Sequence, residues 1–498
     1  MGVVIKQSIK GTLSTYIGAL ITFFTVLYIV PKFIGDELYG LIRVILEAGA
    51  LFALIFQLGS ASSILRFFPW FKSEDKKNNG FFFYMMAWTT LGAILFIPVF
   101  FLLKQPITDY FSKSPLFVNY LYWLIPLTLF FLYWQTFELY ANALMRIAIP
   151  KFIREVAVKM LTIGIFLAYA FGYIGQNGLI IGLVCIYGIA MLVIFFYIAR
   201  IGAVSLKHDS SFITPTLKKD FISYTSVIAL GTLGSALIGK IDVFMISGEM
   251  GLAWTGIYSI AFYMIAIIEI PSRIISSITS PIAVEALKNN DSQTANDLYK
   301  NVSTHQLLFG SAIFLLLWIN IDNIYGIIPN GEVYSAGKWV VLLIGIAKLI
   351  EMTIGFGSVL ISFSKYYHWH LYFLIFIPGL TILLNLLLIP RFGISGAAIS
   401  TVCAGCISYF LQQWIVLVKL KANPYSWGTL KTIGVIALLF CINYFLPSFE
   451  NPYFDMLFRT FIISITGVIL IYRLRISGQT NELLLFVITK IGRIIKKK

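Results

Sequence analysis

The chain has 498 residues, of which 59% are hydrophobic and only 12% are charged, and its mean hydropathy is +0.88. Soluble domains average about 25% charged and about 45–50% apolar residues, so this composition excludes a water-soluble globular protein and indicates that lipid is the main solvent. Four cysteines in a chain of this length exclude a disulfide scaffold. The net charge of +15 is typical of nucleic-acid binding or of membrane topology, and the positions of Lys and Arg decide between them.

Fourteen segments are apolar and long enough to cross a bilayer, for which a helix needs about 20 residues. In chain order the predicted spans are 11–31, 41–65, 81–103, 116–139, 156–174, 179–199, 221–247, 254–286, 302–320, 339–363, 371–389, 397–417, 430–446 and 456–472. The span at 254–286 is longer than one crossing, so it is expected to run past the bilayer or to kink at Pro271. The sequence therefore predicts an all-α polytopic membrane protein.

The basic residues predict the orientation of these spans. With the N-terminus inside, 27 of the 37 Lys and Arg residues fall in cytoplasmic segments, five in outside loops and five within spans. The positive-inside rule then places both chain ends in the cytoplasm. The basic charge is thus mostly a topology signal, and no nucleic-acid partner is expected.

Two glycine-containing sequences recur at nearly the same offset. IGDELYG, with Gly35 and Gly40, returns as MGLAWTG, with Gly251 and Gly256, 216 residues later. YIGQNGL returns as RFGISGA at an offset of 218. Two matches that agree within two residues favour a duplicated unit over independent turn chemistry. Six crossings per repeat would make the two lobes parallel, as in transporters with a central cavity.

The repeat predicts four parts of the chain. Residues 1–205 are expected to form an N-lobe of helices 1–6, and residues 206–421 a C-lobe of helices 7–12. Residues 422–476 hold two additional helices. Residues 477–498 combine apolar side chains with a terminal lysine run, which predicts a basic amphipathic cytoplasmic tail that lies on an anionic leaflet or snorkels to the interface.

Charged residues inside the predicted spans come in neighbouring pairs. A charge at the bilayer centre costs at least about 2.5–3.5 kcal/mol and normally faces a partner or a water-filled cavity. The four pairs are Arg43 with Glu47, Lys240 with Asp242, Glu269 with Arg273, and Lys348 with Glu351. Spacings of three or four residues place both members on one helix face, whereas the two-residue spacing of Lys240 and Asp242 does not. Cations spread through the membrane suit the passage of an anionic group, and ion pairs that only tie helices together are the alternative.

Catalytic and cofactor signatures are missing. The four histidines lie in predicted cytoplasmic loops or at a helix start, not within the membrane. Cys403 and Cys406 form a CxxC inside a span without a second pair, which favours helix packing over metal binding. No nucleotide-binding or hydrolase motif has suitable flanks. Neither an enzyme nor a metal or other cofactor is expected.

Two longer stretches resemble a known family. Residues 241–267, IDVFMISGEMGLAWTGIYSIAFYMIAI, contain Asp242 followed by a Gly-x4-Gly-x-Tyr pattern that ends in Gly256 and Tyr258. Residues 389–401, IPRFGISGAAIST, resemble the late loop of the same family, with a Pro, a Gly and a Gly-Ala-Ala that opens a helix. Together with the fourteen spans, they resemble the MATE-like group of flippases, and more narrowly the Wzx-type polysaccharide flippases.

This resemblance implies a V-shaped, two-lobed fold with a cationic cavity. It implies that the substrate is an undecaprenyl-diphosphate-linked oligosaccharide, turned from the cytoplasmic to the periplasmic leaflet by alternating access for surface polysaccharide such as O-antigen, capsule or exopolysaccharide. Lys and Arg suit a pyrophosphate. The candidate substrate-binding cations are Arg43, Lys240, Arg273 and Lys348 in the spans, and Arg146 and Lys151 at the inner mouth. Family members vary in where these charges lie.

The remaining expectations concern the coupling ion, the partners and the alternative functions. Glu47, Asp242, Glu269 and Glu351 are candidate coupling-ion sites or structural acids, with a proton or a sodium ion as the coupling ion. Membrane lipids, a polysaccharide polymerase and chain-length proteins are the expected partners, in a bacterial cytoplasmic (inner) membrane. A lipid II flippase and a MATE-type multidrug antiporter are the alternatives. The antiporter is disfavoured because bases accompany the buried acids.

Overall fold

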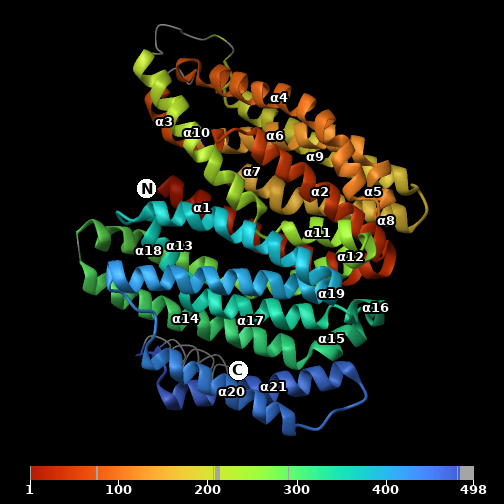
Figure 1. The fold of residues 1–498 in the computed structure, drawn as a ribbon, viewed down its shortest axis with the longest axis vertical. Coiled ribbons are helices and arrows are strands. Elements are labelled where there is room, and N and C mark those ends of the chain that lie inside the picture. The colour runs from red at the N-terminus through yellow and green to blue at the C-terminus, as the bar shows by residue number, and fades with distance from the viewer. Residues whose placement is uncertain are drawn as a thin grey trace, which may run out of the picture. The chain divides into compact units, whose positions relative to one another are not determined.

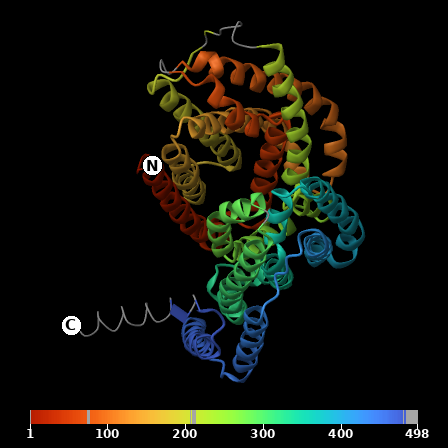
Figure 2. The ribbon, with the colours of Figure 1, turned by 90° about the vertical axis from the view of Figure 1, so that its left-hand side faces the viewer.

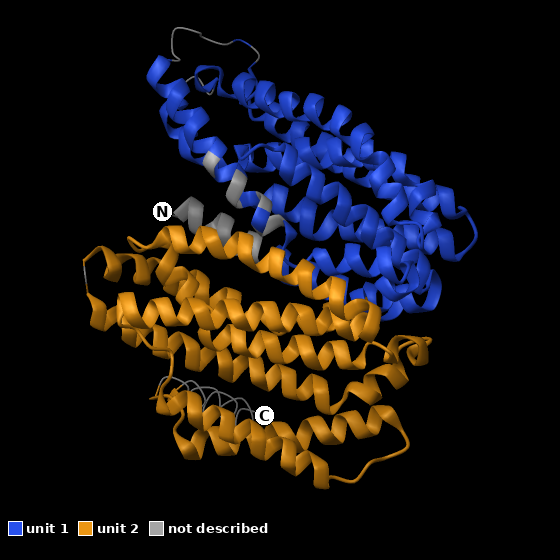
Figure 3. Cartoon of the chain, in the orientation of Figure 1, with its two compact units in different colours: residues 1–259 blue, residues 260–498 orange. Residues whose placement is uncertain are grey.

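Helices form the regular structure of this protein throughout the part that the structure describes. The structure is a computed structural model that describes residues 2–73, 77–205, 207, 214–289, 291–478 and 481–482. The predicted basic tail, 477–498, lies almost wholly outside these residues. The chain divides into two compact units, residues 1–259 and residues 260–498, shown in Figure 3. The predicted lobe boundaries at 205 and 421 stay predictions.

Unit 1 contains the helices from the start of the chain to α12, of which the α-helices are labelled in Figure 1. They are α1 (Gly2–Phe24), η1 (Thr25–Ile34), α2 (Asp36–Phe56), α3 (Ser60–Phe71), η2 (Asn78–Gly80), α4 (Phe81–Tyr110), α5 (Pro115–Asn119), η3 (Leu121–Trp123), α6 (Leu124–Ala143), α7 (Ala148–Phe152), η4 (Ile153–Ala157), α8 (Val158–Ala170), α9 (Gln176–Arg200), α10 (Pro215–Leu237), α11 (Ile241–Glu249) and α12 (Leu252–Ala266), the last of which continues into unit 2.

Unit 2 contains the remaining helices. They are α13 (Glu269–Lys288), α14 (Ser292–Ile319), α15 (Ile321–Ile327), α16 (Gly331–Ser335), α17 (Lys338–Ile354), α18 (Phe356–Ser362), α19 (Tyr367–Ile415), η5 (Val416–Leu420), α20 (Trp427–Phe445) and α21 (Pro452–Leu474). Helices α14, α17 and α19 pack in sequence against one another, and α20 pairs with α21 beside α14 (Figures 1 and 2).

Each predicted span coincides with one helix or with consecutive helices. Eight described helices are long and apolar enough to cross a membrane, or up to ten if each of two bent pairs counts as one span. An all-α polytopic membrane protein is therefore confirmed, whereas the count of fourteen is not. Residues 367–420 count as a single one of these spans, which lowers the total. Within them, the backbone of α19 leaves the helical region at Gly393, with φ 59° and ψ −139°. A Cβ on Gly396 would lie 2.2 Å from the carbonyl oxygen of Leu388, eight residues earlier.

That contact shows that the chain reverses direction within α19. In a continuous helix, residues eight positions apart are separated by about 12 Å along the axis. The reversal at Gly393 therefore divides α19 into two antiparallel segments, which correspond to the predicted spans 371–389 and 397–417. The long predicted span 254–286 breaks at a different place from the one expected. Helices α12 and α13 meet at a 50° bend around Ile267 and Ile268, and Pro271 falls in the first turn of α13, where its missing N–H costs no hydrogen bond.

The first repeated glycine sequence and its later copy adopt the same conformation and contact each other within unit 1. Gly35 and Gly251 precede α2 and α12 with φ of 83° and 98°. Five residues on, a Cβ on Gly40 would lie 1.9 Å from the carbonyl oxygen of Leu252, and one on Gly256 would lie 2.0 Å from that of Asp36. Glycine is required at both positions because the two helix starts approach backbone to backbone.

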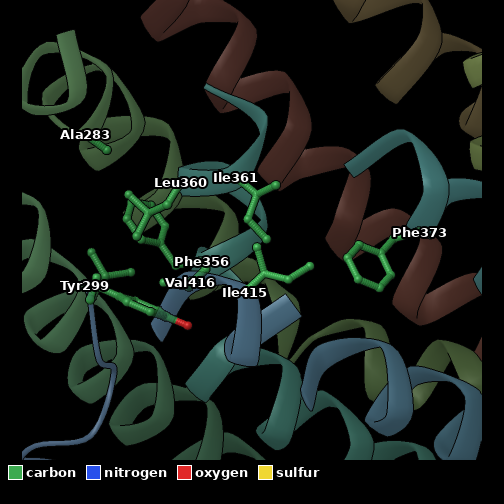
Figure 4. Packing of buried hydrophobic residues seen from close by; sticks show 10 residues of the cluster. Ala283, Tyr299, Phe356, Leu360, Ile361, Phe373, Ile415 and Val416 are labelled. Carbon is green, nitrogen blue, oxygen red and sulfur yellow. The ribbon is translucent and has the colours of Figure 1, made fainter. Parts of the chain in front are cut away.

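A buried apolar cluster anchors the bend between α17 and α18 in unit 2. Tyr299 of α14 donates a hydrogen bond of 2.7 Å to the carbonyl oxygen of Ile354 and lies against the side-chain amide of Gln413. Figure 4 shows Tyr299 among Phe356, Leu360 and other apolar side chains of α18 and η5. The carbonyl freed where α17 ends is thus satisfied inside the protein, as an interrupted membrane helix requires.

Candidate functional site: two charged clusters within the apolar helices

Three charged residues of unit 1 form one cluster, called here the first cluster: Arg43, Glu47 and Lys240. Glu47 Oε1 lies 2.6 Å from Arg43 Nη2, and Glu47 Oε2 lies 2.6 Å from Lys240 Nζ. The three side chains are only 16–20% exposed. One carboxylate therefore holds two cations, and the cluster carries a formal charge of +1.

A break in the backbone brings Lys240 to this carboxylate. Helix α10 ends at Leu237, Gly239 takes a positive φ of 77°, and Lys240 is the residue that immediately precedes α11. Both α10 and α11 pack against α2, which carries Arg43 and Glu47. The long-range contact between Lys240 and Glu47 thus depends on the interruption of a predicted span.

Asp242, two residues after Lys240, contacts a tyrosine on the next helix. Its carboxylate accepts a hydrogen bond of 2.5 Å from the hydroxyl of Tyr258 on α12, and the residue is 3% exposed. Tyr258 itself is 1% exposed. The pair joins α11 to α12 in the interior of unit 1.

Four charged residues of unit 2 form the second cluster: Glu269, Arg273, Lys348 and Glu351. Lys348 Nζ lies 2.7 Å from Glu269 Oε1 and 2.9 Å from Glu351 Oε2, and Arg273 Nη2 lies 2.6 Å from Glu269 Oε2. Charges of opposite sign therefore alternate along the row from Arg273 to Glu351. The cluster joins α13 to α17 and has a formal charge of zero.

The second cluster is partly open. The Arg273 side chain is 75% exposed and that of Glu351 is 39% exposed, whereas Glu269 and Lys348 are 23% and 22% exposed. Tyr409 of α19 interacts with Glu351 through its hydroxyl. Beyond the charged residues, α13 also has a polar contact with α14, because the side-chain amide of Gln306 donates to Ser276 Oγ at 2.9 Å.

All seven clustered residues were identified from the sequence as charges within predicted spans, and each pair at a spacing of three or four forms an ion pair in the structure. Spacing along one helix could not reveal the two contacts between helices, Lys240 with Glu47 and Lys348 with Glu269. These contacts combine the predicted pairs into larger groups. Their role in substrate binding stays a prediction.

The two cations predicted at the inner mouth lie in unit 1 but not together with the first cluster. Arg146 is exposed between α6 and α7, and Lys151 lies in α7, where it interacts electrostatically with Glu138. Glu138 belongs to a further group that sequence reasoning missed. Its other members are Arg154, Glu155 and Lys159, with ion-pair distances of 2.8–3.1 Å. The spacing of four between Glu155 and Lys159 was the available signal.

Outside the membrane-spanning segments, a shifted carboxyl lies at the start of α14. Asp291 precedes the helix and accepts hydrogen bonds from the backbone N–H of Thr294, at 3.0 Å, and from the Thr294 hydroxyl, at 2.6 Å. These bonds lower the pKa of Asp291 below its ordinary value of 3.8. Asp291 is thus an N-cap that remains ionised in moderately acidic solution.

The relatives found by sequence comparison match only part of this chain. No family model matches the chain. A probable low-salt glycan biosynthesis flippase, Agl15, of Haloferax volcanii is 23% identical over 277 residues, which cover 51% of this chain and 56% of that protein. The chain spans about half the length of the curated relatives that it matches.

Solved structures establish the fold. The lipid II flippase MurJ, in an inward closed conformation, matches with a TM-score of 0.68 at 14% identity, covering 94% of this chain and 100% of that one. An inward-facing multidrug resistance transporter of the MATE family, from the MOP superfamily, matches with a TM-score of 0.59 at 14% identity, covering 81% and 94%. The resemblance to the MATE-like group is thus confirmed at the level of fold, and the chain is a multi-pass membrane protein.

Proposed function

We propose that this protein is a flippase that moves a lipid-linked oligosaccharide from the cytoplasmic to the outer leaflet of a cell membrane by alternating access. The observation that carries the proposal is the first cluster, in which two cations share one carboxylate and leave a positive charge among apolar helices. The likeness to a probable glycan biosynthesis flippase supports the glycan as cargo, and the fold supports transport.

The chemistry of the first cluster suits a diphosphate. A buried charge is costly, so an excess cation inside the membrane is expected to serve a ligand of opposite sign. Arg43 offers a planar fork of donors and Lys240 a compact ammonium, and both suit phosphate oxygens. The sugars would need a polar path and the prenyl chain can remain in lipid. An undecaprenyl diphosphate carrier, for O-antigen or a similar surface polysaccharide, is the specific form of this proposal.

Arg146, Lys151 and the second cluster take supporting roles in the proposal. The two unit 1 cations would attract the diphosphate at the cytoplasmic mouth, and Arg273 with Lys348 would contact it in unit 2. Asp242, Glu269 or Glu351 would couple transport to a proton or a sodium ion. The proposal includes cytoplasmic chain ends and a bacterial inner membrane, with a polymerase and chain-length proteins as partners.

The test of this proposal is charge removal with an intact carboxylate partner. Lys240→Gln leaves Glu47 paired with Arg43 but cancels the excess charge of the first cluster. Surface polysaccharide should then be lost in cells that depend on this protein, while lipid-linked oligosaccharide accumulates inside. Lys348→Gln tests unit 2 in the same way. Protein level and melting temperature should stay close to those of the original protein.

The matched control is Lys288→Ala, which removes an exposed lysine at the end of α13. It should leave surface polysaccharide unchanged. Normal polysaccharide in both Lys240→Gln and Lys348→Gln, at normal protein levels, would show that these lysines do not carry substrate.

Lipid II is the second candidate cargo, because MurJ shares this fold over nearly the whole chain. Its diphosphate places the same demand on the first cluster. The two cargoes are separated by expressing the protein in cells depleted of their own lipid II flippase. Restored growth would identify lipid II, whereas continued lysis together with restored surface polysaccharide in a polysaccharide-deficient strain would identify the oligosaccharide.

A further inference from the structure

A polar cavity lies within unit 2, and no residue of the second cluster lines it. Its volume is about 360 Å³, it is open on one side, and it is lined by the last turn of α14, α15, the start of α17 and the hairpin formed by α20 and α21. This volume falls within the range of about 300–1,000 Å³ typical of small-molecule sites. Under the predicted topology this end of unit 2 faces the outside.

The floor of the cavity is a fixed hydrogen-bond network around Asp455. This carboxylate is 4% exposed. It accepts from Arg459 Nε at 2.7 Å, from Asn323 Nδ2 at 2.6 Å and from the backbone N–H of Phe449 at 3.0 Å. Arg459 in turn donates to Asn443 Oδ1 at 3.0 Å and to the Pro447 carbonyl at 3.2 Å. The network holds α15, α20 and α21 together.

This network determines how two lining amides are oriented. A guanidinium only donates and a carboxylate only accepts, so Asn443 must direct its oxygen toward Arg459 and Asn323 its nitrogen toward Asp455. The donor Asn443 Nδ2 and the acceptor Asn323 Oδ1 are therefore left over, and within the described residues neither has a protein partner. The cavity thus offers one donor and one acceptor that are pre-oriented for a ligand.

The rest of the lining is aromatic and balanced in charge. Trp318, Phe440 and Phe449 contribute aromatic surface. At the rim, Lys338 forms an ion pair with Asp322 at 2.6 Å, and the Asp322 side chain is 77% exposed. The two cations of the lining are matched by two carboxylates, so neither an anion nor a cation is favoured as the ligand.

We propose that this cavity binds one sugar unit of the translocated oligosaccharide, an inference that rests on the proposed function. A sugar hydroxyl both donates and accepts, which matches the two free amide atoms of Asn443 and Asn323. The apolar face of a sugar ring packs on aromatic surface such as Trp318. A site at the predicted outer end of unit 2 would hold the glycan after it has crossed.

The test measures binding of free sugars to the full-length protein. The protein is placed in lipid nanodiscs, because detergents with sugar headgroups would compete for the site. Saturation-transfer NMR is then recorded with glucose, galactose, mannose and N-acetylglucosamine, and with inorganic pyrophosphate as the anionic probe. At least one neutral sugar should bind, and pyrophosphate should not displace it.

The decisive variant is Asn443→Asp, which keeps the oxygen that accepts from Arg459 but removes the free donor. The dissociation constant of the sugar should rise tenfold or more. Asn451→Asp is the matched control, because it makes the same chemical change in the loop between α20 and α21, outside the cavity lining, and Asp also caps a helix. Trp318→Leu provides a second probe of the lining if Asn443→Asp folds poorly.

Three results would overturn the inference: no neutral sugar binds, pyrophosphate alone binds, or Asn443→Asp and Asn451→Asp bind sugar equally well. Lys240→Gln, measured in parallel, separates this inference from the proposed function. It should abolish translocation and retain sugar binding. Sugar binding together with normal surface polysaccharide in Lys240→Gln and Lys348→Gln would contradict the proposed function alone.

Discussion

The first and second clusters both place charged side chains among apolar helices, but they pair those charges differently. In the first cluster Glu47 is the common partner of Arg43 and Lys240. In the second cluster Lys348 is held by two carboxylates, and Glu269 by two cations. The loss of one carboxylate therefore leaves two like charges together in unit 1 but still leaves Lys348 a partner in unit 2.

This difference suggests a division of labour. The first cluster has an excess charge and side chains that are at most 20% exposed, so its positive potential is only weakly screened. The second cluster is neutral and extends to the exposed Arg273. In the proposed function, the excess charge makes the first cluster the main diphosphate site, and the balanced second cluster has the supporting role.

The largest loss of stability is expected from Glu47→Gln. It leaves Arg43 and Lys240 near each other without their shared carboxylate, and removal of one partner from a buried pair costs about 3–5 kcal/mol. Glu269→Gln should cost less because Lys348 remains paired with Glu351. Thermal unfolding in nanodiscs measures both. Equal losses of stability would contradict the difference between the clusters, and Glu332→Gln, at an exposed position in α16, is the control.

The next largest loss of stability is expected where helices pack closely at a glycine. Gly40→Ala would place a Cβ 1.9 Å from the backbone of Leu252, which has little freedom to move, and such overpacking costs about 1–3 kcal/mol. Gly310→Ala would meet the flexible side chain of Met352, at 2.1 Å, which can change rotamer. Gly40→Ala should therefore lower the melting temperature more than Gly310→Ala. Gly434→Ala, with no neighbouring atom within 4 Å, should have little effect.

A smaller effect is expected at the exposed end of the second cluster. Arg273→Gln removes a cation whose side chain is 75% exposed, and exposed ion pairs contribute about 0–1 kcal/mol. Glu269 keeps Lys348 as its partner. Arg43→Gln, by comparison, removes a cation that is 16% exposed and should destabilise the protein more. Unfolding measured at low and high salt checks this order, since screening should weaken only the Arg273 contribution.

The smallest effect is expected outside both clusters, at Asp291. Asp291→Asn retains a capping side chain and removes only the charge. Because the folded-state pKa of Asp291 is lowered, its carboxylate stabilises the protein at pH values above its ordinary pKa of 3.8, and this contribution is lost as pH falls through the lower folded value. The stability difference between the original protein and the variant should therefore shrink as pH falls below 3.8 and disappear once pH is below the folded-state pKa of Asp291. A constant difference at all pH values would assign the effect to the hydrogen bonds instead.

Local patterns were sufficient to predict the elements and the near neighbours. Hydropathy located the spans, and spacings of three or four identified Arg43 with Glu47, Glu269 with Arg273 and Lys348 with Glu351. The offset of the glycine sequences identified two segments that do share a conformation. Each of these features depends on residues within one or two helical turns, or on sequence identity between copies.

Contacts between distant residues could not be predicted in this way. The breaks near Lys240 and around Ile267 and Ile268 depend on how each interrupted helix packs against its neighbours. The polar cavity of unit 2 combines α15 with a hairpin more than 100 residues later, and no local pattern connects them.

The sequence by itself therefore determined that this chain spans a membrane, is helical and buries paired charges. Exposing a backbone group or a charge to hydrocarbon is costly at each residue, so local sequence is enough to show these features. Only the tertiary structure decided that Glu47 forms ion pairs with two cations and that Lys348 forms ion pairs with two carboxylates. Which charges meet depends on the directions of separate helices, and small changes in a bend move a side chain by more than the length of an ion pair.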